Sequence, residues 1–334
     1  MNKKWKFLIA GVILFALSLI FCQRAEEGLS LTHILLSHPL NAAEISQITR
    51  QEAQEAAPLR FCFQGQGEDT AVSSPLTGVS RTVTPTYLAG NPELMNAAPL
   101  LWQEGCLIDE GTAQALFGTP HCGFQLLKMG NRTLPVLGTV PGSLPRILLL
   151  AQPQDGPVLN RLVLSLPQSQ GAGQGEAFLL RHDLGGTLLA YDLPQSLMKN
   201  LLLLFPALLS AAFWRSLRKG YRTLTLSGVL HGQQRKLLLR TALSFLLTLG
   251  TLWYFGRRLT IPAHMLPTRW SDFSFWGRWW EAQKGNCLAI ASTAPTAEQL
   301  QMTENMVKSI GTALAADLLA LRAVRRNPHA NPAD

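Results

Sequence analysis

The sequence predicts an α+β domain, residues 24–196, inserted into an α-helical membrane domain of three helices, or of four if residues 309–321 also span. Two observations lead to this fold class. Only 15% of the 334 residues are charged and 47% are hydrophobic, and the apolar residues gather in separate long runs. The segment between the first and second runs is instead rich in Gly, Pro and Thr, with short apolar stretches bounded by turn residues, which is typical of strands.

The first apolar run, residues 7–23, carries no charge and follows a basic segment, residues 1–6. This order is typical of a signal peptide or of an uncleaved signal anchor. Because Phe21 and Cys22 are bulky where a cleavage site requires small residues, the sequence favours an anchor whose first six residues lie in the cytoplasm.

Two further apolar segments, residues 197–214 and 241–256, contain uncharged runs of 15 and 16 residues. A helix of that length spans about 24 Å, which is short of the roughly 30 Å hydrocarbon core, but flanking Lys and Arg side chains extend it by snorkelling. The alternative is a pair of buried core helices. That alternative needs a large soluble domain around them, which the C-terminal half does not offer, so we expect two more membrane helices.

The distribution of charge predicts the orientation of these helices. The segment between the second and third, residues 215–240, holds seven basic residues and no acidic one, so we expect a cytoplasmic loop. Residues 24–196 hold nine basic and 15 acidic residues and are expected outside the cytoplasm. An acidic domain of this size argues against nucleic acid as a partner.

Within the outer domain, Asn41 and Glu44 are spaced as a capping box at the start of a helix. A short helix is expected over residues 109–117 and ends at Gly118. Strands are expected at residues 82–87, 132–139, 146–150 and 161–166. Cys106 and Cys122 bracket the short helix, so a disulfide between them and two free buried thiols are both compatible with the sequence.

No motif for catalysis or for metal binding stands out. Sequences of the P-loop, HExxH, CxxC and GxSxG types are absent. Two S-x-x-K sequences, Ser196 to Lys199 and Ser216 to Lys219, would place a serine nucleophile one helical turn from a base, but both lie at membrane edges, where basic residues anchor helices. We therefore expect no enzyme, no cofactor and no metal.

The C-terminal region is expected to lie at the membrane surface. Residues 257–295 are rich in tryptophan, which is typical of an interfacial segment. Residues 296–326 repeat apolar residues at heptad spacing and predict an amphipathic helix, followed by a tail, residues 327–334. The alternative is a fourth membrane helix within this region, although the apolar stretch is short and contains Asp317. The tryptophans of the interfacial segment are Trp270, Trp276, Trp279 and Trp280.

Residues 90–140 resemble the periplasmic core domain of MacB/FtsX-like ABC-transporter permeases, in which a helix ending in LFG is followed by a strand pair and a V-x-G-V-like turn. The residues that carry this resemblance are Gly105, Leu116, Phe117, Gly118, Gly123, Gly130 and residues 136–140.

Residues 215–239 are similar to the segment between the second and third helices of the same family. This resemblance implies an ATPase-coupling segment that contains Arg218, Lys219, Arg222, Gly232, Arg235 and Lys236. The segment departs from the family by lacking an acidic residue near its start.

The resemblance as a whole implies a shortened, non-catalytic permease-like subunit of an ABC transporter complex of the mechanotransmission type. It would be a multi-pass protein of the bacterial cytoplasmic membrane, with a cytoplasmic ABC ATPase and a second permease chain as partners in the lipid bilayer. The alternative is a membrane-anchored binding or sensory protein that has kept the fold without transport.

Overall fold

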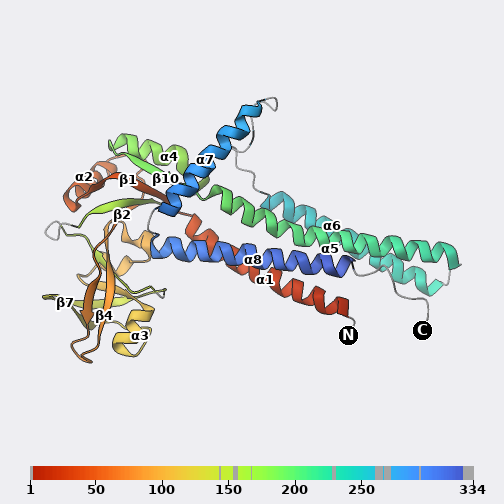
Figure 1. The fold of residues 1–334 in the computed structure, drawn as a ribbon, viewed down its shortest axis with the longest axis horizontal. Coiled ribbons are helices and arrows are strands. Elements are labelled where there is room, and N and C mark those ends of the chain that lie inside the picture. Colours follow the sequence, from red (N-terminus) through yellow and green to blue (C-terminus); the bar gives the residue numbers. More distant parts are fainter. Residues whose placement is uncertain are drawn as a thin grey trace. The chain divides into compact units, whose positions relative to one another are not determined.

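A computed structural model gives the fold (Figure 1). It describes residues 3–142, 144–152, 157–166, 168–227, 231–259, 266, 272–292 and 295–325. The predicted tail, residues 327–334, and Trp270 lie outside the described residues. The chain divides into two compact units, which we call the helical unit and the sheet unit. The helical unit contains Met1–Gly28, Tyr191–Gln283 and Leu300–Asp334, and the sheet unit contains Leu29–Ala190 and Lys284–Gln299.

The sheet unit is built on one ten-stranded sheet in the order β10-β1-β9-β2-β4-β3-β6-β7-β5-β8. Because β8 also pairs in parallel with β4, the six strands from β4 to β8 in this order form a closed ring, and β10, β1, β9 and β2 extend from it as an open arm. The strands are β1 (Thr32–Leu40), β2 (Phe61–Gln66), β3 (Thr70–Ser73), β4 (Ser80–Gly90), β5 (Cys106–Asp109), β6 (Gln125–Met129), β7 (Arg132–Val140), β8 (Arg146–Leu150), β9 (Leu159–Leu164) and β10 (Gly186–Leu189).

The helices of the sheet unit are short. They are α2 (Ala42–Glu52), η1 (Pro92–Met95), η2 (Ala98–Leu101), α3 (Glu110–Phe117) and α4 (Gln168–Arg181). The predicted capping box at the start of α2 is confirmed, since Asn41 Oδ1 accepts from the Glu44 amide at 2.9 Å and Glu44 Oε2 accepts from the Asn41 amide at 2.9 Å. Gly118 ends α3 with φ 76°, a left-handed conformation that favours glycine.

Two apolar clusters hold these helices against the strands. Ile45 and Ile48 of α2 and Phe178 of α4 pack on the open arm, where the side chain of Phe63 is fully buried. Leu116 of α3 packs with the strands of the ring. Each fully buried apolar side chain of this kind contributes roughly 1.5–3 kcal/mol to stability. The sheet unit therefore has a core that extends through both the arm and the ring.

The helical unit contains the long helices (Figure 1). They are α1 (Lys3–Leu29), α5 (Asp192–Ser227), α6 (His231–Arg258), α7 (Phe273–Ser292) and α8 (Ala297–Arg325); α7 and α8 each begin or end in the sheet unit. Among the described residues three helical segments are long and apolar enough to cross a membrane: Lys6–Leu29, Asp192–Arg215 and Leu238–Arg258. These segments contain the three predicted apolar runs, and each is longer than its run because charged residues continue the helix at the ends.

In the helical unit, α8 packs along α1 in the opposite direction. The Ser18 hydroxyl donates to the Ser309 carbonyl at 2.7 Å, and the Ser309 hydroxyl donates to the Ser18 carbonyl at 3.0 Å. Nearer the start of α1, a Cβ on Gly11 would lie 3.6 Å from the carbonyl oxygen of Ala316. Small residues thus let the two backbones approach closely along much of their length.

Candidate functional site

The predicted coupling segment, residues 215–240, is helical where the structure describes it. Helix α5 continues past the end of its apolar segment at Arg215 as far as Ser227, and α6 begins at His231, before its apolar segment starts. Residues 228–230 lie outside the described residues. What the sequence indicated as a loop is therefore an extension of two helices.

The six predicted coupling residues divide between these helices. Arg218, Lys219 and Arg222 lie on α5, and the Arg218 side chain is exposed. Gly232, Arg235 and Lys236 lie in the first two turns of α6. The side chains of Lys219, Arg222, Arg235 and Lys236 lie outside the described residues.

Polar side chains form hydrogen bonds between α5 and α6. Among the described residues the hydrogen-bonded pairs include Ser210 with Thr251 at 2.9 Å, Trp214 with Thr248 at 2.8 Å and Tyr221 with Thr241 at 3.1 Å. Tyr221 lies beyond the apolar segment of α5, so the packing of the two helices continues into the basic part of the hairpin. We call α5 and α6 from Arg215 to Arg240 the basic hairpin.

At the other end of these helices, the carboxylate of Glu26 on α1 lies between two cations. Glu26 Oε1 is 3.4 Å from Lys199 Nζ on α5 and 3.2 Å from Arg258 on α6. The ammonium group of Lys199 is thus paired with a carboxylate of α1. The Ser196 hydroxyl donates to the carbonyl of Leu193 at 2.9 Å and so supports the first turns of α5. One carboxylate therefore ties three membrane helices together at the end opposite the basic hairpin.

In the sheet unit, the first turn of α8 is held by two buried arginines. Arg146, at the start of β8, pairs with Glu298, and Arg161 on β9 donates to Gln299 Oε1 at 3.2 Å. Both arginines are 8% exposed. Thr296 caps the helix, because its hydroxyl accepts from the Gln299 amide at 3.3 Å while Gln299 Oε1 accepts from the Thr296 amide at 3.1 Å.

The preceding helix is fixed to the same unit by a two-point amide pairing. The Asn286 side chain on α7 donates to the Ala190 carbonyl at 2.6 Å and accepts from the Ala190 amide at 3.2 Å. Nearby, burial lowers the pKa of His33 on β1 to about 4, with Arg161 acting in the same direction and Glu298 opposing it. His33 is thus neutral at physiological pH, and the arginines supply the positive charge of this region.

Sequence reasoning missed these anchors. The sequence predicts a helix over residues 296–326 and strands that begin at Arg146 and Arg161, but none of the contacts between them. The one available signal was the placement of arginines within apolar strand segments, where a buried cation requires a partner. We call Arg146, Arg161, Asn286, Glu298 and Gln299 the outer anchors.

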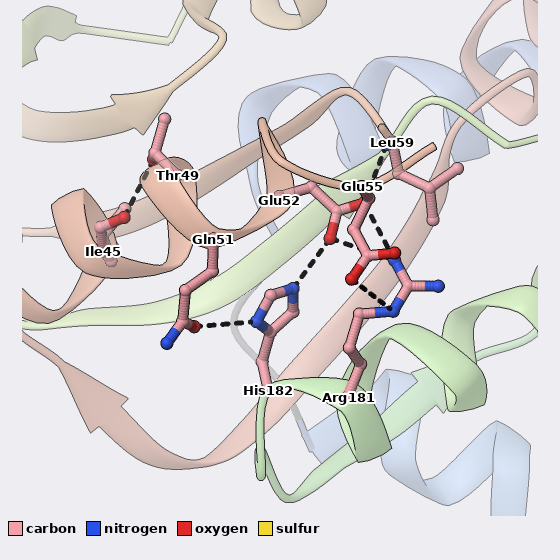
Figure 2. Close-up of polar contacts among 8 residues, drawn as sticks. All are labelled: Ile45, Thr49, Gln51, Glu52, Glu55, Leu59, Arg181 and His182. Atoms are coloured by element: carbon pink, nitrogen blue, oxygen red, sulfur yellow. Dashed lines mark hydrogen bonds and ion pairs between the residues drawn. The ribbon is translucent and has the colours of Figure 1, made fainter. Parts of the chain in front are cut away.

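A second buried network joins α2 to the end of α4 (Figure 2). Glu52, whose side chain is 2% exposed, accepts from the Leu59 amide at 2.9 Å, from His182 Nε2 at 2.9 Å and from Arg181 at 3.1 Å on both oxygens. Burial by itself raises the pKa of Glu52, but the hydrogen bonds from Leu59, His182 and Arg181 outweigh burial and hold that pKa below its ordinary value. The network keeps a carboxylate charged inside the protein.

All five cysteines are free thiols in the structure. Cys106 and Cys122 belong to the same apolar cluster inside the ring, and burial raises the pKa of Cys106 to about 12. A thiol with so high a pKa is a poor nucleophile. The disulfide between these two residues stays a prediction. Within the described residues, no three or more His, Cys, Asp or Glu side chains are grouped so as to hold a metal ion.

No protein-family model and no curated protein matches the sequence. The solved structures that are similar to about half of the chain include the following three. The first is the periplasmic region of MacB from Actinobacillus actinomycetemcomitans, with 10% identity, a TM-score of 0.37, and coverage of 49% of this chain and 89% of that one.

The second is the extracellular domain of the ABC-type transporter YknZ from Gram-positive bacteria, with 10% identity, a TM-score of 0.35, and coverage of 47% and 98%. The third is a domain of a protein described as a permease from Porphyromonas gingivalis, with 13% identity, a TM-score of 0.35, and coverage of 50% and 92%. All three TM-scores are below 0.5. Part of this chain is thus similar, at low TM-scores, to periplasmic or extracellular domains and to a permease domain.

Proposed function

We propose that the chain is a non-catalytic permease-like subunit of an ABC transporter complex, in which a cytoplasmic ATPase moves the basic hairpin and the membrane helices carry that movement to the sheet unit. The observation that carries this proposal is the continuity of α5 and α6 from their apolar segments into the basic hairpin. A continuous helix transmits a displacement of its end, whereas a flexible loop absorbs it.

The dimensions of α5 suit this role. Its 36 residues correspond to about 54 Å of helix, which exceeds the roughly 30 Å hydrocarbon core. The part beyond Arg215 therefore extends into the aqueous phase, where the Arg218 side chain is exposed. The hydrogen bond between Tyr221 and Thr241 resists separation of the two helices in this part.

We also infer that α8 crosses the membrane beside α1. The face of α8 that packs on α1 is built from small and polar residues such as Ser309, Ala313 and Ala316, all at most 2% exposed. On the opposite face of α8, Val307 and Leu318 are 64% and 60% exposed, whereas Met302 and Met306, nearer the start of the helix, are buried. Small residues inward and large apolar residues outward are expected of a helix surrounded by lipid.

The outer anchors give the movement a route into the sheet unit. Glu298 and Gln299 belong to the sheet unit and also form the first turn of α8, which continues from Leu300 in the helical unit. Because Arg146 and Arg161 hold that turn by buried polar contacts, a shift of α8 along its axis acts directly on β8 and β9. We therefore propose that α8, as well as the basic hairpin, takes part in transmitting the movement to the sheet unit.

Lipid and a second permease chain are the proposed surroundings of α6. Within the helical unit, only 6% of the apolar segment of α6 is buried. Its exposed side chains include Leu246, Leu252 and Trp253, each at least 63% exposed. A helix with so little of its apolar surface covered leaves room for a second membrane protein.

The test is purification of the full-length chain from its native bacterial membranes in a mild detergent. We expect a P-loop ATPase to be retained and identified by mass spectrometry, and ATP hydrolysis by the purified complex. The triple variant Arg218→Gln, Lys219→Gln, Arg222→Gln should lose the ATPase, because it removes three cations from the basic hairpin while leaving its other basic residues to preserve topology.

The control is a variant of the sheet unit with exposed cations changed in the same way, Arg50→Gln with Lys128→Gln, which should retain the ATPase. Retention of the ATPase by the triple variant would contradict coupling through the basic hairpin. Recovery of the wild-type chain without any ATPase would favour the alternative, a membrane-anchored binding or sensory protein.

A further inference from the structure

The sheet unit contains a pocket of about 290 Å³. Its walls come from β4 and β7, labelled in Figure 1, from β8 and from the segment that follows η2. The volume lies near the lower end of the roughly 300–1,000 Å³ that small-molecule sites occupy. The pocket is therefore large enough for a small ligand and too small for a folded partner.

The inner wall of the pocket is apolar. Leu100 and Leu149 are 2% and 7% exposed and belong to the core, and Tyr87, Met129 and Leu134 complete this wall. Such a surface favours a ligand that offers C–H groups on one side.

The rim of the pocket has a different character. Trp102, at the end of η2, is 82% exposed, although a tryptophan usually buries most of its surface. The other exposed polar residues that line the pocket are Gln103, Glu104, Arg132 and Gln152. The rim thus combines an exposed indole ring with four planar polar side chains. Of these four, one is negatively charged and one is positively charged.

The segment that bears this rim is held in place. The Trp102 amide donates to the Pro99 carbonyl at 3.3 Å. At Gly105 the backbone lies directly against β7, because a Cβ there would be 2.5 Å from the carbonyl oxygen of Pro135 and 2.8 Å from Leu137 Cγ. A side chain at residue 105 would push the segment away, so glycine fixes the rim at its distance from β7.

We propose that this pocket binds one or two rings of a neutral saccharide. A pyranose ring has an apolar C–H face, which stacks on the electron-rich face of an indole, and a periphery of hydroxyl groups. Gln, Glu and Arg together donate and accept the hydrogen bonds that hydroxyl groups need. The rim has no net charge, which fits a neutral ligand better than a phosphate or a nucleotide, for which several cations are required.

The proposal is independent of the transport function proposed above. The pocket contains no residue of the basic hairpin or of the outer anchors, so saccharide binding does not depend on either. The other occupant to be tested is an apolar side chain of a peptide, which would contact the inner wall and Trp102 but form no hydrogen bond with Gln103 or Glu104.

The experiment uses the full-length chain transferred into an amphipol, because detergents with sugar headgroups would compete. Maltotriose, cellotriose and chitotriose serve as probes, with affinity measured by isothermal titration calorimetry and contacts by saturation-transfer NMR. We expect at least one trisaccharide to bind and its ring C–H protons to receive saturation. Trp102→Ala should weaken that binding about tenfold or more, because the stacking surface is lost.

The matched control is Phe124→Ala, which removes another exposed aromatic side chain of the sheet unit, 78% exposed, that does not line the pocket. It should bind as the wild type does. Glu104→Gln tests the rim separately and should weaken binding while leaving the stacked protons saturated. Absence of binding by all three trisaccharides, or unchanged binding by Trp102→Ala, would overturn the proposal. So would binding of a tri-phenylalanine peptide in the absence of any saccharide binding.

Discussion

Three charged side chains of the sheet unit, Glu52, Arg146 and Arg161, are less than 10% exposed, and each pairs with a residue more than 100 positions away in the sequence. A buried charge costs several kcal/mol unless it is paired and hydrogen-bonded. Each pair therefore specifies one arrangement of its two segments, because any other arrangement leaves a charge without a partner. Glu52 fixes the end of α4 to α2, and the two arginines fix the first turn of α8.

Replacing Glu52 tests this at the scale of one residue. Glu52→Gln removes the anion that Arg181 and His182 share, leaves Arg181 only the longer contact with Glu55, and should lower the free energy of unfolding by about 2 kcal/mol. The folded-state pKa of Glu52 is below its ordinary value, so its contribution is present above that ordinary value and is lost as the pH falls through the folded-state pKa. The variant should therefore show a weaker loss of stability on acidification.

The measurement is the unfolding midpoint of the full chain as a function of pH. Glu55→Gln is the matched control, because Glu55 also pairs with Arg181, at 3.9 Å, but its side chain is 43% exposed. That change should have little effect. Equal effects of the two substitutions would contradict the role given to burial.

At the scale of elements, the face of α8 that is buried is not the face that carries its large heptad residues. The heptad of large apolar residues that predicts the helix forms its outward face, where Leu300, Val307 and Leu314 are 41%, 64% and 45% exposed. The inward face is recognisable only once α1 is beside it, because Ser309 and Ala316 become packing residues through Ser18 and Gly11. The pattern correctly indicates a helix, and its packing partner determines which face is buried.

A disulfide between α1 and α8 checks this packing. In a chain whose own cysteines are changed to serine, Ser18→Cys with Ser309→Cys should cross-link within one chain on mild oxidation, since the two native hydroxyl oxygens are 3.2 Å apart. Ser18→Cys with Val307→Cys is the control and should stay reduced, because Val307 points outward. After the chain is cleaved between α1 and α8, a non-reducing gel shows whether the two fragments stay linked. A cross-link in the control variant alone would contradict the packing.

At the scale of the whole molecule, the charge distribution and the helices together make a prediction about sidedness. The basic hairpin is expected in the cytoplasm and the sheet unit outside it. In a chain without its native cysteines, a membrane-impermeant maleimide should label Lys128→Cys in intact cells, and should label Arg218→Cys only after permeabilisation. Both side chains are exposed in the structure, so accessibility within the protein does not limit either reaction. Labelling of Arg218→Cys in intact cells would reverse the assigned orientation.

The sequence by itself determined the features that depend on neighbouring residues. The three apolar segments, the capping box of Asn41 and Glu44, the glycine end of α3 and most of the predicted strand segments follow from local composition and spacing, and the structure has them. Helix α4 was not predicted, because three glycines within Gln168–Arg181 lower its helix propensity, whereas packing of Phe178 on the arm stabilises it.

Only the tertiary structure decided the features that join distant segments. Pairing of β8 with β4 closes the ring, Glu298 and Gln299 find their arginines on β8 and β9, and α5 and α6 continue into the basic hairpin as a packed pair. The pocket beside Trp102 likewise combines η2 with strands from three other parts of the chain. Local sequence carries no record of which segments will meet, because the free energy of these contacts arises from burial and charge pairing between residues that the chain brings together only on folding.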